Sequence, residues 1–412
     1  FSKGGMGGFA LFSALLFVLH PIQTQAVTYI VQRFTSLATM FYLLSLVMYI
    51  KFRSQQSAIS GQQKLPATRY TLYAASFFSA ILAMKTKEIA FTLPVVIALY
   101  EFMFFEGKIK KRILYLIPIL LTMLIIPLSL IGVDKPIGDA IGELREASQE
   151  TEEIPRWSYL LTQFKVIITY IRLLFLPINQ NLDYDYPLSH SFFNPEVFLS
   201  FLFLLLILAF GIYLSYTKRY KRPPQADATR LISFGIFWFF ITLSVESSII
   251  PIRDVINEHR LYLPSIGIII GFISATFYIL QAMIQNPKRS LAACCLLLVT
   301  AVIVLSIAAY ERNIIWQDEV SLWEDVVKKS PKKVRGHNNL GNAYDDKGMP
   351  DKAIEHYQIA LRINQTYAEA YNNLGNAYYK KGLTDKAIEH YQIALKLKPD
   401  YAEIYNNIGI AY

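Results

Sequence analysis

Long uncharged stretches of apolar residues dominate the chain from its start to Tyr310. A hydrocarbon core about 30 Å thick takes roughly 20 helical residues to cross. Stretches of that length without a charge cover residues 113–131, 197–217, 263–285 and 291–310. Weaker stretches, shorter or closely bounded by charge, cover residues 34–50, 70–84, 89–105 and 231–250. The pattern predicts a multi-pass membrane protein with roughly ten membrane-embedded helices.

Composition excludes a soluble chain, because 54% of the residues are hydrophobic, 14% are aromatic and only 17% are charged. The two cysteines, Cys294 and Cys295, are adjacent inside an apolar stretch. They therefore predict neither a disulfide framework nor a zinc site, and we expect no metal. The chain begins at Phe1 without a methionine and stops inside a repeat at Tyr412. We expect it to be a fragment at both ends.

Basic residues cluster in a few loops between the apolar stretches, which explains the net charge of +9. Short basic loops stay on the cytoplasmic side of a membrane. The basic groups lie at residues 51–69, 108–112, 218–230 and 288–289. The opposite loops, and everything after residue 311, are then predicted to be extracytoplasmic. No nucleic-acid partner is expected, because no aromatic-interleaved basic face accompanies the charge.

The region 157–177 must begin and end on the outer side in this topology. It therefore predicts a re-entrant or interfacial helix. Its polar residues Lys165, Thr169 and Arg172 fall on one stripe of an otherwise apolar helix.

The last part of the chain is repetitive. "NNLGNAY" at Asn338 recurs at Asn372 and, as "NNIGIAY", at Asn406, while "DKAIEHYQIAL" at Asp351 recurs at Asp385. This spacing and pattern are typical of tetratricopeptide repeats, which form a helical solenoid that binds proteins. We expect the array to continue beyond Tyr412. Its predicted protein-binding residues are Asn338, Asn342, Asn372, Asn376 and Asn406.

The predicted fold class is all-α, with a polytopic transmembrane domain followed by a tetratricopeptide α-solenoid. The predicted boundaries are residues 1–310 for the membrane domain, 311–335 for a connector with a degenerate repeat helix, and 336–412 for the repeats.

Polar residues gather in the loops predicted to be outside. Holding ionisable groups against apolar spans costs free energy, which a partner or ligand must offset. Cations there suit a lipid phosphate, and a carboxylate suits activation of a hydroxyl. The residues are His20, Arg33, Lys87, Glu88, Asp183, Asp185, Arg253, Asp254, Glu258, His259, Arg260 and Tyr262.

Each of these residues also has a structural interpretation. His20, before a proline, is equally a helix cap, and Lys87 with Glu88 has an alternative interpretation as a simple interfacial pair. The two aspartates of "LDYDYP" are equally turn formers. Arg260 with Tyr262 has the composition of an interfacial anchor.

Several segments together resemble a known family over nearly the whole chain. The segments are "HPIQTQAVTYIVQR", "KTKEIAFTLP", "NLDYDYP", "ESSIIPIRDVINEHRLYLPSIG" and "ERNIIWQDEVSLW", followed by the repeats. They resemble the transmembrane and tetratricopeptide-repeat protein O-mannosyltransferase family and its bacterial relatives, of the C-type glycosyltransferase superfamily. Relatives often carry Glu-Arg-Tyr where this chain has Glu258, His259 and Arg260.

The resemblance implies an enzyme that moves a sugar, possibly mannose, from a polyprenyl-phosphate donor to Ser or Thr hydroxyls of a protein. The transfer would take place outside the cytoplasm, with the repeats holding the acceptor or a partner protein. It implies no other cofactor and leaves metal dependence open. The expected membrane is the bacterial inner membrane, or that of the endoplasmic reticulum in a eukaryote.

The resemblance also implies site residues. The acidic base of such enzymes lies in the first extracytoplasmic loop, which is expected upstream of Phe1. The expected donor-site residues are Lys87, Glu88, Arg253, Glu258, His259, Arg260 and Tyr262; further candidates are His20, Arg33, Asp183, Asp185, Lys165 and Arg172.

Two alternatives remain open from the sequence. One is a membrane-anchored scaffold without catalysis, whose repeats recruit envelope or secretion proteins. The other is a transporter or flippase of lipid-linked intermediates, which the lack of internal pseudo-symmetry disfavours.

Overall fold

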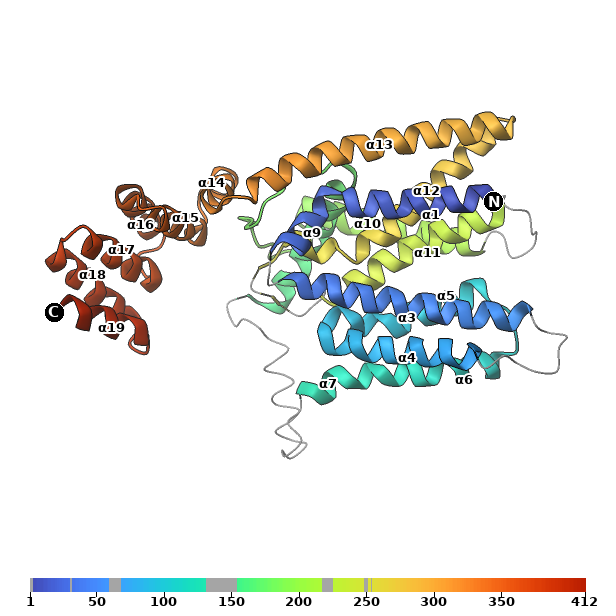
Figure 1. Cartoon of the computed structure of the whole chain (residues 1–412), viewed down its shortest axis with the longest axis horizontal. Coiled ribbons are helices and arrows are strands. Elements are labelled where there is room, and N and C mark those ends of the chain that lie inside the picture. Colours follow the sequence, from blue (N-terminus) through green and yellow to red (C-terminus); the bar gives the residue numbers. More distant parts are fainter. Residues whose placement is uncertain are drawn as a thin grey trace. The chain divides into compact units, whose positions relative to one another are not determined.

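The computed structural model describes residues 3–29, 32–58, 68–130, 154–216, 225–247, 251–252 and 254–412. Within these ranges every regular element is a helix, which confirms the all-α class. The chain divides into two compact units. The membrane unit is Phe1–Ile178 with Leu188–Ala309, and the repeat unit is Asn179–Pro187 with Tyr310–Tyr412 (Figure 1).

The membrane unit is built from apolar helices joined by short 3-10 turns. Its elements are α1 (Lys3–Leu19), η1 (Pro21–Gln23), α2 (Thr24–Thr28), α3 (Arg33–Ala58), α4 (Thr68–Thr86), η3 (Glu88–Thr92), α5 (Leu93–Phe104), α6 (Ile109–Leu121), η4 (Thr122–Leu124), α7 (Ile125–Leu130), α9 (Arg156–Phe175), α10 (Pro195–Tyr216), α11 (Gln225–Leu243), η5 (Glu258–Leu261), α12 (Pro264–Met283) and α13 (Pro287–Ile315).

Six helices in the described ranges are long and apolar enough to cross a membrane, or seven if the bent pair Gly8–Leu19 and Pro21–Thr28 counts as one span. The four strongest predicted stretches coincide with α6–α7, α10, α12 and α13. The chain is therefore a multi-pass membrane protein. The region predicted to be re-entrant or interfacial, α9, is one unbroken helix of 20 residues that passes the same length and composition test.

Close helix packing shapes the centre of the membrane unit. Helices α11 and α12 approach at Gly235 and Gly267, where a Cβ added to Gly267 would lie 2.6 Å from the carbonyl oxygen of Gly235. Small residues at such crossings let backbones touch where there is no hydrophobic driving force between helices. Beside this crossing, Trp238 is buried and its indole N–H donates to the Leu263 carbonyl at 2.9 Å. The contact ties α11 to the start of α12.

A buried carboxylate joins three helices at the end of the unit that carries the basic loops. Glu101 of α5 is fully buried, and Arg53 of α3 donates to both of its oxygens at 2.7 Å. Arg112 of α6 adds a third bond at 3.1 Å, and the Tyr49 hydroxyl adds a fourth at 3.1 Å. Ionisable groups between membrane helices need partners of this kind.

The repeat unit consists of helical hairpins. Its elements are α14 (Glu319–Lys329), α15 (Val334–Asp346), α16 (Pro350–Ile363), α17 (Ala368–Lys380), α18 (Thr384–Leu397) and α19 (Ala402–Ala411). In each complete repeat a glycine of the first helix faces a buried tyrosine ring of the second, Gly341 with Tyr357 and Gly375 with Tyr391. The glycine lets the two helices approach. Gly348 and Gly382, at φ of 71° and 75°, end the first helices.

The segment Asn179–Pro187 belongs to the repeat unit although it lies between α9 and α10 in the chain. Leu182 packs on Leu322 and Val326 of α14. The Asp183 carboxylate is 3% exposed and pairs with Arg335 at 2.7 Å and Lys333 at 3.4 Å. This segment is therefore part of the array's own packing.

We expect Gly375→Ala to destabilise the repeat unit by about 1–3 kcal/mol, because overpacking a full core forces neighbours to move. The new Cβ would lie 2.5 Å from a ring carbon of the buried Tyr391. Gly409→Ala is the matched control, since no atom lies within 4 Å of its added Cβ. Hydrogen exchange of α17 and α18 in the full chain measures the effect; equal protection in both variants would contradict it.

We expect Asp183→Asn to release the segment Asn179–Pro187, because it removes a charge from a nearly buried ion pair with two cations. The loss should be about 1–2 kcal/mol, since Arg335 and Lys333 remain partly in water. Asp185→Asn is the control, because the Asp185 side chain is exposed and its contact with Ser330 is made by the backbone N–H. Faster amide exchange over 179–187 in the first variant alone is the expected result.

Candidate functional site

A polar cluster forms where α4 ends and where α11 ends. Lys87 has an extended backbone and directly precedes η3 as its N-cap residue. Its Nζ lies 3.2 Å from Oε1 of Glu246, which follows α11 in a turn. The same ammonium donates to Thr35 Oγ1 at 2.8 Å. Lys87 is 17% exposed and Glu246 13% exposed. The pair thus reaches a surface but is mostly shielded from water.

The loop before α12 folds against this pair and is held by Arg260. This guanidinium is only 2% exposed, and it donates to the carbonyls of Val255 (3.1 Å) and Asp254 (2.7 Å). Its Nη1 also lies 3.3 Å from the Tyr159 hydroxyl, which in turn donates to the Glu246 carbonyl at 3.0 Å. Arg260 therefore connects the loop to the backbone that carries Glu246.

Helix α9 and the η1–α2 segment complete the support of the loop. The Tyr170 hydroxyl both donates to the Asn257 carbonyl and accepts from the Asn257 N–H, each at 3.0 Å. The Gln163 amide donates to the Val255 carbonyl at 3.0 Å. From the other side, the His259 N–H donates to Gln25 Oε1 at 2.9 Å. The loop is therefore fixed through its main chain.

Burial and charge set the protonation states. Burial alone would raise the pKa of Glu246, but the positive charges of Lys87 and Arg260 outweigh it and lower that pKa. Burial lowers the pKa of His259 to about 3, although the charge of Glu246 opposes the shift. Burial disfavours the charged form of Arg260, yet the tyrosine hydroxyls and Glu246 raise its pKa. At neutral pH the site holds ionised Glu246, charged Arg260 and neutral His259.

Several buried polar atoms of the loop and its supports have no hydrogen-bond partner within the described ranges. They are Gln23 Oε1, Gln163 Oε1, Ser247 Oγ and His259 Nδ1. Buried polar atoms in folded proteins are normally paired, so their gathering near one loop marks an interior suited to polar ligand groups or water.

An apolar groove of about 520 Å³ lies between residues of η3 and α5 on one side and the end of α11 on the other. One wall comes from residues shortly after Lys87, and the other ends one residue before Glu246. The lining residues are Phe91, Thr92, Val95, Phe240, Ile241, Ser244 and Val245. The groove and the charged pair are thus carried by the same elements, and together they suit an amphiphile with a charged head.

The structure brings together part of the set predicted from sequence. Lys87, Glu258, His259 and Arg260 lie in or around this cluster, with Glu258 1% exposed and His259 8% exposed. Tyr262 is half-buried, with its ring 5.1 Å from the ring of Phe17.

Two other members of that set stand apart. Glu88 is exposed, so it does not form the interfacial pair with Lys87, whose partner is Glu246. Arg253 lies outside the described residues.

The further candidates of the membrane unit have structural partners elsewhere. His20 caps η1 by accepting from the Ile22 N–H at 3.1 Å, and its other ring nitrogen donates to the Leu174 carbonyl at 3.0 Å. Lys165 pairs with Glu196 at 2.8 Å, and Arg172 donates to the Ile178 carbonyl. Arg33 is exposed and bonds the Val27 carbonyl.

The candidates of the repeat unit fall into two groups. Asp183 is buried by its ion pairs, while Asp185 is exposed. Among the asparagines, Asn338 and Asn372 are buried, Asn342 and Asn376 are half-buried, and Asn406 is exposed.

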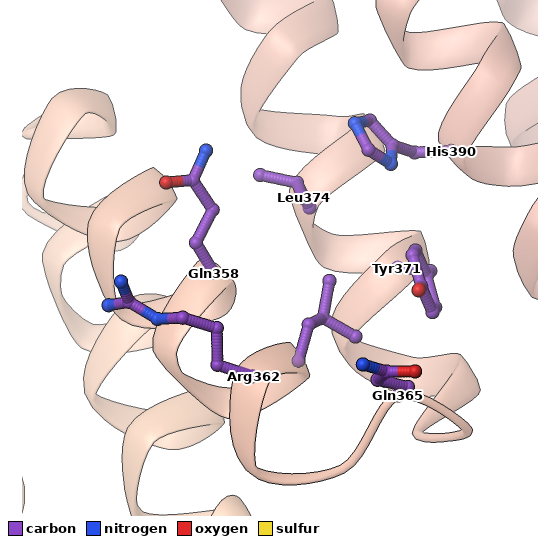
Figure 2. A pocket seen from close by; sticks show the side chains of 7 residues that line it. Gln358, Arg362, Gln365, Tyr371, Leu374 and His390 are labelled. Carbon is purple, nitrogen blue, oxygen red and sulfur yellow. The ribbon is translucent and has the colours of Figure 1, made fainter.

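A second hollow, of about 420 Å³, lies between consecutive repeats. Figure 2 shows Leu374, Tyr371 and His390 on one side of it and Gln358 and Arg362 on the other. The His390 ring stacks on Tyr378 with 5.3 Å between ring centroids. The hollow is open and mixed in polarity, as a seat for a side chain of a bound protein would be.

Glu246 is the residue that sequence reasoning missed. It lies inside the predicted weak span 231–250, where an acid between apolar residues is costly. That placement was the available signal. Within the described ranges, no group of three or more His, Cys, Asp or Glu side chains could hold a metal ion.

Comparisons with known proteins bear on both units. The chain is 24% identical over 401 residues to protein O-mannosyl-transferase Tmtc3 of Drosophila melanogaster, covering 86% of this chain and 40% of that protein. It is 24% identical over 396 residues to protein O-mannosyl-transferase TMTC1 of Homo sapiens, covering 88% of this chain and 43% of that protein. The chain spans about two fifths of the length of these relatives.

The repeats match a family model described as TPR repeat, over residues 341–382 and 375–412. Among solved structures, the crystal structure of MamA is 28% identical, covering 34% of this chain and 75% of that one, with a TM-score of 0.22. A TM-score this low establishes no shared architecture. The similarity over most of the chain and the repeats that follow confirm the resemblance seen in the sequence: the chain is similar to the transmembrane and tetratricopeptide-repeat protein O-mannosyltransferases.

Proposed function

We propose that this chain carries the donor site and part of the protein-binding array of a membrane glycosyltransferase. The enzyme moves a sugar, mannose by analogy with the names of its relatives, from a polyprenyl-phosphate to a Ser or Thr hydroxyl of a protein. The observation that carries the proposal is the shielded pair of Lys87 and Glu246, whose neighbours in the chain line an apolar groove.

Lys87 is the residue that binds the donor phosphate in this proposal. Its ammonium has three donors, and the structure gives one to Thr35 and directs another toward Glu246. An ammonium at the edge of an apolar site stabilises a phosphate oxygen, and more so as the sugar–phosphate bond breaks and charge grows on the phosphate. The reaction is then a displacement at the anomeric carbon, with the lipid phosphate as leaving group.

Glu246 positions Lys87, because its carboxylate lies 3.2 Å from the ammonium nitrogen. A carboxylate whose pKa is lowered by two cations accepts a proton poorly near neutral pH. We therefore do not assign Glu246 as the base for the acceptor hydroxyl. Arg260 does not contact the donor in this proposal, because its guanidinium donates to the carbonyls of Val255 and Asp254. It supports the site by holding the loop in place, together with the tyrosines that contact it.

The apolar groove takes the first isoprene units of the donor. Its walls are aliphatic and aromatic side chains, with the hydroxyls of Thr92 and Ser244 as the polar groups. Transfer on the extracytoplasmic side is part of the same proposal. It is supported by the basic loops, which are predicted on the opposite side of the membrane.

We expect Lys87→Met to lower transfer about 10- to 100-fold, the range that loss of one charge-assisted hydrogen bond allows. Glu246→Gln should show a smaller loss, since it leaves the ammonium in place but less well oriented. Glu88→Gln is the matched control, because that neighbouring carboxylate is exposed. The assay uses the intact protein in nanodiscs with labelled polyprenyl-phosphate mannose and a Ser/Thr peptide.

The outcome of this assay separates the transferase from the scaffold. If Glu88→Gln and Lys87→Met lowered the transfer rate equally, Lys87 would not be the residue that binds the donor phosphate. Absence of transfer by the unaltered intact protein, with peptide binding retained, would favour the non-enzymatic scaffold.

The pKa of His259 leads to a pH prediction. In the folded chain the pKa of His259 is about 3, whereas its ordinary value is 6.5. As the pH falls below 6.5, His259 therefore binds a proton in the unfolded chain but stays neutral in the folded chain. His259 therefore stabilises the fold above pH 6.5, and this contribution is lost toward pH 3. The His259→Gln variant should unfold at a lower midpoint than the unaltered chain at pH of about 7.5. The difference between the two midpoints should become smaller as the pH drops to about 5. A deficit that stays constant over this range would contradict the assignment.

A further inference from the structure

Consecutive repeats meet along two interfaces that can be compared residue by residue. In the first interface α14 packs on the hairpin of α15 and α16, and in the second interface α16 packs on the hairpin of α17 and α18. Each hairpin stacks a histidine of its second helix on a tyrosine of its first helix. The ring centroids are 5.6 Å apart for His356 and Tyr344, and 5.3 Å apart for His390 and Tyr378. Residues one repeat apart therefore occupy corresponding places.

The first interface satisfies its own polar groups. The Tyr344 hydroxyl donates to the carboxylate of Glu324 on α14. Nε2 of His337 donates to the Pro331 carbonyl at 3.0 Å, and Nδ1 of the same ring lies 3.3 Å from Nδ1 of His356. A neutral His337 ring then carries its proton on Nε2, so its Nδ1 accepts a hydrogen bond from His356. This interface thus contains both an acid and an acceptor for the stacked histidine.

The second interface lacks both of these groups. Gln358 stands one repeat after Glu324, and Tyr371 stands one repeat after His337. Nδ1 of His390 is buried, and no atom in the described ranges forms a hydrogen bond with it. Burial lowers the pKa of this imidazole, so the ring is neutral near pH 7 and can donate through Nδ1. A nitrogen that is paired in the first interface is therefore left without a partner in the second.

The hollow of about 420 Å³ lies in the second interface, where His390 and Tyr371 face it from one side and Gln358 and Arg362 from the other (Figure 2). Most of its lining residues belong to the second helices, α16 and α18. Each polar lining residue carries an N–H or O–H donor, and no lining residue is an acid. Leu361 and Leu374 supply apolar surface. The hollow therefore suits an acceptor on a short apolar stem.

Arg362 gives the hollow its charge. Its side chain is exposed, and it forms no ion pair with another residue in the described part of the chain. The corresponding residue of the first interface is Lys328, which stands one helical turn after Glu324 on α14. On α16 the residue one turn before Arg362 is Gln358, which has no charge. The second interface thus keeps the cation of the first without its carboxylate.

We propose that this hollow binds the side-chain carboxylate of a Glu or Asp residue in a partner polypeptide. The carboxylate accepts from the Arg362 guanidinium and from the His390 ring, while its methylene stem lies on Leu361 and Leu374. Hydrogen bonds between an ionised donor and an ionised acceptor are stronger than those between neutral groups. The partner in this way supplies the acid and the acceptor that the first interface contains by itself.

The test measures peptide binding to the full chain in phosphatidylcholine nanodiscs without donor lipid. The probe is the peptide Gly-Ser-Leu-Glu-Leu-Ser-Gly with an uncharged fluorophore and both ends blocked, so that its only charge is the central side chain. We expect the same peptide with Gln at the centre to bind roughly tenfold more weakly, because a charge-assisted hydrogen bond is lost. Equal affinity of the two peptides, or binding of neither, would overturn the proposal.

A third peptide distinguishes a side chain from a chain terminus as the source of the carboxylate. It has Gln at the centre and a free C-terminal acid. We expect it to bind as weakly as the blocked Gln peptide. If it bound as tightly as the Glu peptide, the assignment to a side chain would be wrong.

Arg362→Gln should weaken binding of the Glu peptide roughly tenfold and leave the Gln peptide unaffected, because it removes the charge and keeps an amide donor. Lys328→Gln is the matched control, since it removes the same charge from the corresponding exposed position one repeat earlier. Binding to this control should stay within about twofold of the unaltered chain. Equal weakening in both variants would mean that only overall charge matters, against the proposal.

Gln358→Glu gives the second interface the acid that the first one contains. The new carboxylate lies one helical turn from Arg362 and competes with the peptide, so affinity for the Glu peptide should fall roughly tenfold. Gln392→Glu is the control, because Gln392 is the exposed residue one repeat later and does not line the hollow. Unchanged affinity in Gln358→Glu would contradict the proposal. Gln358 and Arg362 are exposed, so both variants should keep the unfolding midpoint of the unaltered chain.

These measurements are separate from the proposed transfer reaction. Lys87→Met should leave binding of the Glu peptide unchanged, and Arg362→Gln should leave transfer to a peptide without acidic residues unchanged. A chain that prefers the Glu peptide and transfers no sugar would refute the transferase alone. A chain that transfers sugar and does not distinguish Glu from Gln would refute the carboxylate site alone.

Discussion

The cost of removing charge from water governs both ends of the membrane unit. At one end Glu101 is satisfied by Arg53, Arg112 and a tyrosine, and it joins three helices. At the other end Arg260 is satisfied by main-chain carbonyls and Tyr159, and it fixes a loop. Neither charge could be buried alone, since an unpaired ion in such surroundings costs several kcal/mol. The positions of Lys87 and Glu246 follow from this second anchor.

The two ends differ in what the pairing leaves exposed. Glu101 itself is fully buried, and four hydrogen bonds from Arg53, Arg112 and Tyr49 satisfy its two oxygens. The pair of Lys87 and Glu246 is partly open, and residues that follow Lys87 and precede Glu246 in the chain line an apolar groove. Hydrogen bonds account for both oxygens of Glu101, whereas the Lys87 ammonium has three donors, of which one goes to Thr35 and another is directed toward Glu246.

Much of the architecture could be predicted from the sequence, because hydropathy and a regular repeat period are local signals. The strong spans and the repeat hairpins fall where those signals lie. Lys87 and His259 could be placed near each other because topology puts their loops on one side. Glu246 was missed, although an acid within an apolar stretch was a readable sign.

The remaining contacts depend on residues far apart in the chain. Asp183 gave no sign that Arg335, on a helix much later in the chain, is its partner, and the tyrosine-rich motif around it reads equally as a turn. Arg260 looked like a phosphate ligand because it is a cation beside an apolar span. The folded structure is needed to show that its guanidinium donates to main-chain carbonyls. For His20, the structure selects the cap from two interpretations that the sequence left equal.

The segment Asn179–Pro187 makes the repeat array dependent on a piece of chain synthesised well before it. A fragment starting at Tyr310 would lack the packing of Leu182 on Val326 and the ion pair of Asp183 with Arg335. The first hairpin can therefore reach its final packing only when the earlier segment is at hand. An array excised for separate production would begin its solenoid with an uncovered end.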